Sequence, residues 1–165
     1  MHTDRTPFLR SSRTSLVLRV LGAIFLLFVG ADHYYEYSVD QYSVLPTIGT
    51  LFLLNFISAT AIGLILLAPL DRILRRFGSL ALRLAALSGA AVAFTSLIAL
   101  LASEQTKLFG FMESNYRPAI IVAIATEAAA ALLLALLFVV SLVAGRPILR
   151  SGAKLADRPQ PSTTV

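Results

Sequence analysis

The sequence predicts an all-α protein, a bundle of four transmembrane helices with both termini in the cytoplasm. Three observations support this fold class. Hydrophobic residues make up 57% of the chain and charged residues 14%, whereas soluble domains average about 45–50% and about 25%. The apolar residues gather in four stretches, each near the roughly 20 residues that cross a hydrocarbon core. Most lysines and arginines lie in alternate segments between or beside these stretches, as the positive-inside rule requires.

The four predicted spans follow one another with short connections. Their ranges are 14–31, 47–68, 79–102 and 118–144. The first is the shortest and contains Arg19 near its start, from where the side chain can reach the headgroups. Prolines flank the spans and interrupt none of them: Pro46, Pro69, Pro118 and Pro147. Because proline suits the first turn of a helix and breaks its interior, we expect four unkinked helices.

The orientation follows from the basic residues. Basic residues form three groups of four. The first runs up to the start of the first span, the second runs from the middle loop to the start of the third span, and the third follows the fourth span: Arg5, Arg10, Arg13 and Arg19; Arg72, Arg75, Arg76 and Arg83; Arg146, Arg150, Lys154 and Arg158. The loops 32–46 and 103–117 hold only two further basic residues. We therefore expect a multi-pass protein of the cell membrane, in bacteria the inner membrane. Segment 1–13 and a disordered tail, 146–165, would lie in the cytoplasm, and both loops would lie outside.

The N-terminus has a competing interpretation. The basic start, the apolar run 20–31 and the small residues Val29-Gly30-Ala31 before Asp32 resemble a signal peptide with its cleavage site. Cleavage there would leave three spans. We favour a retained span because Arg19 and the residues before it extend the run toward spanning length.

The most informative polar residue is Glu127, in the fourth span and without a basic neighbour in sequence. Asn55 in the second span and Glu127 both lie about 12–14 Å below the outer surface when depth is counted at 1.5 Å per residue. Thr95 and Ser96 in the third span lie at about 9–11 Å. We expect a polar layer of these four residues, with Asn55 as the partner of Glu127. The layer either holds helices together or handles protons or substrate.

A second group of polar residues follows the first span. His33, Glu36, Tyr37 and Asp40 would share one helix face if that helix continues beyond the membrane surface. We interpret them as a solvated helix end with an interfacial histidine, and expect no metal. The alternatives are a mononuclear metal site and a quinone or lipid headgroup bonded to His33. Cysteine is absent, which excludes disulfides, thiolate metal sites and cysteine nucleophiles.

Small residues recur at four-residue spacing in the last two spans: Ala85, Gly89 and Ala93 in the third, and Ala123, Ala131 and Ala135 in the fourth. Such residues let helices approach closely. We expect them to mark the seams of the bundle.

The first span reads Leu18-Arg19-x-x-Gly22-x-x-Phe25-Leu26, followed by Gly30-x-x-His33. This pattern resembles the opening of DoxX-like proteins, small four-helix membrane proteins common in bacteria. The resemblance covers the first span and the number of spans. It implies a four-helix bundle and, for some members, a link to redox complexes or quinone-coupled sulfur oxidation.

Two kinds of function are compatible with these patterns. The one we favour at this point is a non-catalytic accessory or assembly subunit of a membrane complex, with membrane-protein partners or a second copy of the chain. The alternative is a small proton-coupled transporter that uses Glu127. An enzyme ranks third, because the chain offers no nucleophile–base pair or cofactor motif. We expect contact with the lipid bilayer and none with nucleic acid, and no cofactor unless a quinone binds.

Overall fold

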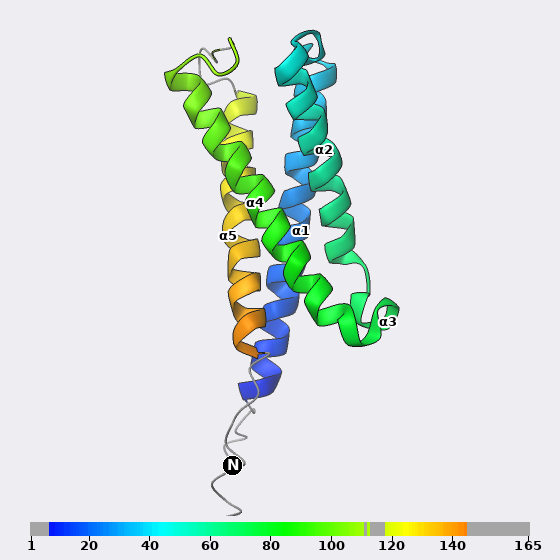
Figure 1. Ribbon diagram of the computed structural model, residues 1–165. Helices are drawn as coiled ribbons and strands as arrows, with labels where there is room; N and C mark the ends of the chain where they lie inside the picture. Colours follow the sequence, from blue (N-terminus) through cyan, green and yellow to red (C-terminus); the bar gives the residue numbers. More distant parts are fainter. Residues whose placement is uncertain (1–6, 111, 113–117, 145–165) are drawn as a thin grey trace, which may run out of the picture.

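The computed structural model describes residues 7–110, 112 and 118–144, and it is all-helical (Figure 1). Four long helices form the body of the protein: α1 (Pro7–Ser38), α2 (Pro46–Leu67), α4 (Gly78–Gln105) and α5 (Pro118–Ala144). Three short elements lie between them: η1 (Tyr42–Val44), α3 (Leu70–Ile73) and η2 (Arg75–Phe77). The predicted tail 146–165 and residues 1–6 lie outside the described residues. Residues 7–13 of the predicted N-terminal segment form the start of α1.

Each of the four long helices contains a segment that is long and apolar enough to cross a membrane. These segments are Arg13–Ser38, Pro46–Leu67, Gly78–Gln105 and Pro118–Val143. The chain therefore has the architecture of a multi-pass integral membrane protein, and the predicted four-helix bundle is confirmed. Since the apolar side chains that face outward have lipid as their solvent, most of the exposed residues on these helices are Leu, Ile, Val or Phe.

Helices α1 and α4 extend beyond the predicted spans, α1 at both ends. The helix α1 continues through residues 32–38, where the predicted span stops at residue 31. It continues because His33 and Glu36 are buried against neighbouring helices rather than ending the span in water. The α4 helix continues to Gln105, three residues beyond the predicted end. The starts of α2 and α5 agree to within one residue: both helices begin at a proline, which is favourable at the first helical position.

The four helices alternate in direction. The helix α1 packs against α2 and α5, while α4 packs along α5 and runs obliquely across the bundle (Figure 1). The end of the bundle where α1 stops and α2 begins carries η1, and we call it the η1 end. The opposite end carries α3 and is called the α3 end. By the predicted orientation, the η1 end is the outer one.

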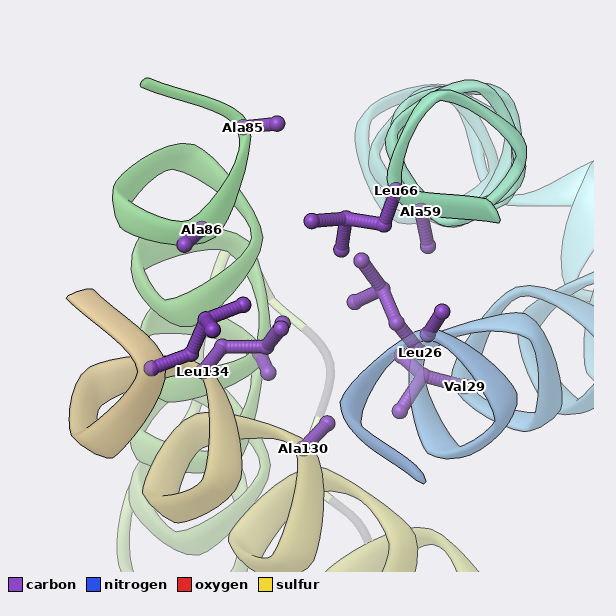
Figure 2. Close-up of a cluster of buried hydrophobic side chains, with 11 residues drawn as sticks. Leu26, Val29, Ala59, Leu66, Ala85, Ala86, Ala130 and Leu134 are labelled. Atoms are coloured by element: carbon purple, nitrogen blue, oxygen red, sulfur yellow. The ribbon is translucent and has the colours of Figure 1, made fainter. Parts of the chain in front are cut away.

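The apolar core lies mainly toward the α3 end of the bundle. Figure 2 shows leucines from α1, α2 and α5 meeting alanines from α2, α4 and α5. Leu134 lies between two glycines on different helices. A Cβ atom added to Gly22 would lie 2.6 Å from the Leu134 side chain, and one added to Gly89 would lie 2.7 Å from it. A Cβ at either position would therefore require the Leu134 side chain to move, because the leucine fills the space that the Cβ would take.

The small-residue stripes divide between interior and surface. Ala85, Gly89 and Ala93 are all buried on α4, where they form the seam with the neighbouring helices. On α5, Ala123 is buried, Ala131 is half-buried and Ala135 is exposed. The α4 stripe therefore packs against other helices of the same chain.

Arg19 differs from its expected role at the headgroups, because its guanidinium has partners within the protein. Its Nε donates to the carbonyl oxygen of Leu66 at 2.5 Å, and its Nη2 donates to that of Ala68. These carbonyls belong to the last turn and the C-cap of α2, where helix carbonyls have no partner within the helix. Arg19 therefore joins α1 to the end of α2, and its charge complements the negative end of the helix dipole.

Candidate functional site

Three polar side chains from three helices meet inside the bundle near the η1 end. Glu127 of α5 is 1% exposed. The Ser96 hydroxyl of α4 lies 2.5 Å from Glu127 Oε1 and 3.0 Å from His33 Nε2 of α1. His33 is 7% exposed, and its Nε2 lies 3.8 Å from the same carboxyl oxygen. We call His33, Ser96 and Glu127 the polar triad.

The other ring nitrogen of His33 fixes the tautomer. His33 Nδ1 lies 2.9 Å from the carbonyl oxygen of Val29, one helical turn earlier. A carbonyl oxygen can only accept, so Nδ1 carries a proton. Nε2 is then an acceptor in neutral histidine and a donor in the protonated ring. This bond also holds the ring with Nε2 toward Ser96.

The Ser96 hydroxyl has a single proton, which leaves two arrangements of the triad with the same proton count. In the first, a neutral Glu127 donates to Ser96, and Ser96 donates to neutral His33. In the second, a protonated His33 donates to Ser96, and Ser96 donates to the Glu127 carboxylate. Two short proton shifts through the hydroxyl convert one arrangement into the other. The triad therefore has the geometry of a proton relay between α1 and α5.

The triad forms part of the wall of a cavity of about 310 Å³. All four long helices contribute to this cavity, together with the segment that follows α4. Its wall is mostly apolar, with a smaller polar part. The lining residues are Asp32, His33, Glu36, Ile48, Leu51, Phe52, Asn55, Thr95, Ser96, Ala99, Leu100, Ser103, Leu108, Ile120, Ala123 and Glu127. A mostly apolar pocket with a few converging polar groups is the usual form of a small-molecule site.

Two buried acceptors on this wall have no hydrogen-bond partner. They are Glu127 Oε2 and Asn55 Oδ1. A buried polar atom without a partner costs about 1–3 kcal/mol, and most such atoms in folded proteins are bonded. Both atoms belong to residues that line one cavity, but the atoms themselves are shielded from it, so a ligand would reach them only if these side chains turned.

The structure brings together part of the predicted polar layer. Ser96 and Glu127 are bonded to each other, and Asn55 lines the same cavity. Asn55 is, however, not the hydrogen-bond partner of Glu127, since Ser96 takes one carboxyl oxygen and the other has none. Thr95 also borders the cavity, but its side chain is exposed and its hydroxyl donates to its own helix, 2.7 Å from the Ala91 oxygen. Successive helical residues point about 100° apart, so Ser96 faces the triad and Thr95 does not.

The predicted outer-rim group is divided. His33 and Glu36 are buried, at 7% and 6% exposed, and both line the cavity, which differs from the solvated helix end that we expected. Tyr37 is half-buried, and Asp40 follows the end of α1; neither lines the cavity. Among the described residues, no three His, Asp or Glu side chains lie together as metal ligands would.

Phe52 and Asp32 were not expected at the site. The Phe52 ring lies 5.0 Å from the His33 ring and is stacked at 5.0 Å on the ring of Tyr42, which belongs to η1. A phenylalanine in an apolar span carries no sequence signal of such a position. Asp32 lies next to His33 in sequence and lines the cavity. The predicted first span ends at residue 31, so Asp32 was not expected inside the bundle.

In comparisons with known proteins, no family model, curated protein or solved structure matches the chain. The resemblance to DoxX-like proteins stays a prediction from the first span. The function has to be argued from the geometry of the triad and its cavity.

Proposed function

We propose that the protein is a small proton-coupled transporter that binds a small, lipid-soluble molecule in the cavity and uses Glu127 as its proton-carrying group. The observation that carries the proposal is the polar triad on the cavity wall. A carboxyl group that is 1% exposed in a membrane-spanning helix is joined through one hydroxyl to an imidazole. Ionisable residues at such positions are rare and typically belong to substrate or proton pathways.

The two unpartnered acceptors support a site more than they support a purely structural contact. A polar contact that only joins helices is most stable when every buried polar atom is bonded. Here Glu127 Oε2 and Asn55 Oδ1 lack partners, and both residues line a cavity large enough for a small ligand. A ligand would supply the missing donors once these two side chains turn toward the cavity.

The accessory-subunit function, with or without a bound quinone, remains the second proposal. It is supported by the wide apolar surface of the helices, which suits membrane-protein partners as well as lipid. The two proposals differ in what they require of Glu127. A subunit needs it only as a hydrogen-bonding group, whereas a transporter needs its proton.

Replacing Glu127 by Gln separates the two proposals. Gln can donate its amide proton to Ser96, which can still donate to His33, so the hydrogen bonds survive while the titrating group is lost. The purified protein is reconstituted in liposomes with a pH-sensitive dye inside, and lipophilic amines, alcohols and carboxylates are added. After subtraction of the flux in empty liposomes, which accounts for passive entry of the neutral amines and acids, we expect at least one class to drive proton flux with the original chain and none with Glu127→Gln.

Thr95→Val is the matched control for this experiment, because it also removes one polar group near the cavity but one that is bonded to its own helix. It should retain the flux. Equal flux with Glu127→Gln, or no flux with any class, would favour the accessory subunit.

The proposed orientation places both termini in the cytoplasm and the cavity nearer the outer surface. It is supported by the basic residues of the segments at the α3 end, including Arg72 and Arg76 of the described chain. A reporter active only in the cytoplasm should work when fused after Val165 and fail when fused after Asp40. An intact mass beginning at Asp32 would instead establish cleavage of the first span.

A further inference from the structure

An open groove lies at the α3 end of the bundle, away from the polar triad. It has a volume of about 400 Å³ and lies between the first part of α1 and the segment that leads from α2 into α3. Arg19 and Arg72 line it, and its other described lining residues are leucines, a valine and a proline. The groove shares no residue with the cavity that the triad borders. It is therefore a separate candidate site with two cationic groups.

Arg19 is fixed beside the groove by the end of α2. Its Nε and Nη2 donate to the carbonyl oxygens of Leu66 and Ala68. A guanidinium has five N–H groups, so these two bonds leave donors for a further partner. The end of a helix carries only about half an elementary negative charge, so the charge of Arg19 is compensated in part. An anion in the groove would meet a cation that is already held in position, which lowers the entropic cost of binding.

Arg72 supplies the second positive charge from α3. Its side chain is exposed, and no described carboxylate lies within ion-pair distance of Arg72 or Arg19. The segment 68–77 contains three arginines and one aspartate, a net charge of +2. The charged groups beside the groove therefore favour an anionic ligand.

The other lining residues suit an acyl chain at the membrane surface. Leu16 and Leu67 are 58% and 44% exposed, and Val20 is 37% exposed. The apolar segment of α2 ends at Leu67, and Arg19 lies six residues after the start of the α1 segment at residue 13, a distance of about 9 Å along the helix. The groove thus begins where two spans reach the headgroups and continues along apolar side chains toward the bilayer interior.

We infer that this groove binds an anionic phospholipid, whose phosphate accepts hydrogen bonds from Arg19 and Arg72 and whose acyl chain lies along Val20. Basic pockets between transmembrane helices are a common form of site for anionic lipid headgroups. A free phosphate ion would use the arginines and leave the apolar residues without a partner. By the proposed orientation, the groove faces the cytoplasmic leaflet, whose surface is negative. The site is independent of the proposed transport and of the ligand in the other cavity.

Native mass spectrometry of the full chain in detergent micelles tests the inference, because each bound lipid adds its own mass. The probes are the palmitoyl-oleoyl forms of phosphatidylglycerol and phosphatidylcholine, which share their chains and their phosphate. Phosphatidylcholine also carries a cation beside the phosphate. We expect the first phosphatidylglycerol to bind about tenfold more tightly than phosphatidylcholine, as two nearby arginines would cause.

Substituting Arg72 tests the charge of the groove. Arg72→Gln should weaken phosphatidylglycerol binding by about fivefold, the effect of about one basic residue near an anionic headgroup, and Arg72→Lys should retain most of it. Arg76→Gln is the matched control: it removes an exposed arginine of the same segment, whose guanidinium lies 4.8 Å from the centroid of the Phe77 ring and does not line the groove. It should change the affinity by less than about twofold. Arg19 is left unchanged because it also binds the end of α2.

A second pair of variants tests the apolar part of the groove without changing any charge. Val20→Trp places a large side chain in the groove and should weaken phosphatidylglycerol binding. Val17→Trp is the control, at a position of α1 that is 54% exposed and does not line the groove. It should bind as the original chain does.

Three results would overturn the inference. Equal affinity for the two lipids would show that the groove does not select an anionic headgroup. Equal losses in Arg72→Gln and Arg76→Gln would assign the binding to diffuse attraction by the basic segment. Displacement of phosphatidylglycerol by inorganic phosphate would assign the arginines to a free anion. The comparison of the two lipids uses the original chain, so it decides the question even if a variant does not fold.

Discussion

The two halves of this bundle are built from the same four helices and differ in how their interiors are filled. Toward the α3 end, Leu134 fits between Gly22 and Gly89, and small residues bring the helices together. Toward the η1 end, the polar triad spans α1, α4 and α5 and borders a cavity of about 310 Å³. Hydrogen bonds hold helices at a set distance without filling the space beside them. The comparison shows how a small membrane protein can combine one closely packed half with another half that contains a cavity.

The largest difference between the halves should appear when matched alanines on α5 are enlarged. Ala130 is fully buried in the core, whereas Ala123, two turns earlier, lines the cavity. Ala130→Leu should lower the free energy of unfolding by about 1–3 kcal/mol, as overpacking of a filled core does. Ala123→Leu should cost markedly less because its side chain can extend into the cavity. Steric trapping in bicelles measures both free energies.

The comparison would fail if the two substitutions had equal effects, because the η1 half would then be as tightly filled as the α3 half. Ala91→Leu, at an exposed position of α4, is the control for a leucine that faces lipid. It should leave the free energy of unfolding nearly unchanged.

A smaller effect is expected from removing the hydroxyl that links the triad. Ser96→Ala deletes the contact with both Glu127 and His33. Hydrogen bonds between membrane helices contribute about 0.6 kcal/mol on average and up to about 1.7, so the loss of stability should lie in this range. Thr95→Val removes the neighbouring hydroxyl, which is bonded to its own helix, and should have almost no effect. Equal losses in the two variants would show that the triad does not hold the helices.

The smallest effect should have the opposite sign. Asn55 Oδ1 is buried without a partner, so Asn55→Leu removes a desolvated acceptor and adds apolar volume beside the cavity. We expect the protein to become more stable by up to about 1 kcal/mol. Thermal unfolding in nanodiscs measures this change. A loss of stability in the ligand-free variant would show that Asn55 has a structural role.

The sequence alone predicts the features that depend on the composition along a single helix. Apolar runs and flanking prolines located the four helices, and depth counting brought Ser96 and Glu127 to one level. The apolar run of the first span ends at residue 31, because Asp32 and His33 follow it. This end predicts that His33 lies at the rim of the membrane. That it faces Ser96 depends on how α1 packs against α4 and α5. The cavity has no sequence signature, since it arises where side chains from four helices leave space.

The hydrogen bonds that Arg19 donates to the end of α2 have a consequence for membrane insertion. An arginine at the centre of an inserting helix costs about 2.5–3.5 kcal/mol on the insertion scale, and less nearer the helix end. The carbonyl oxygens of Leu66 and Ala68 become available to Arg19 only when α2 has crossed back beside α1. The first two helices should therefore enter the bilayer as a hairpin, with the Arg19 guanidinium already hydrogen-bonded within it.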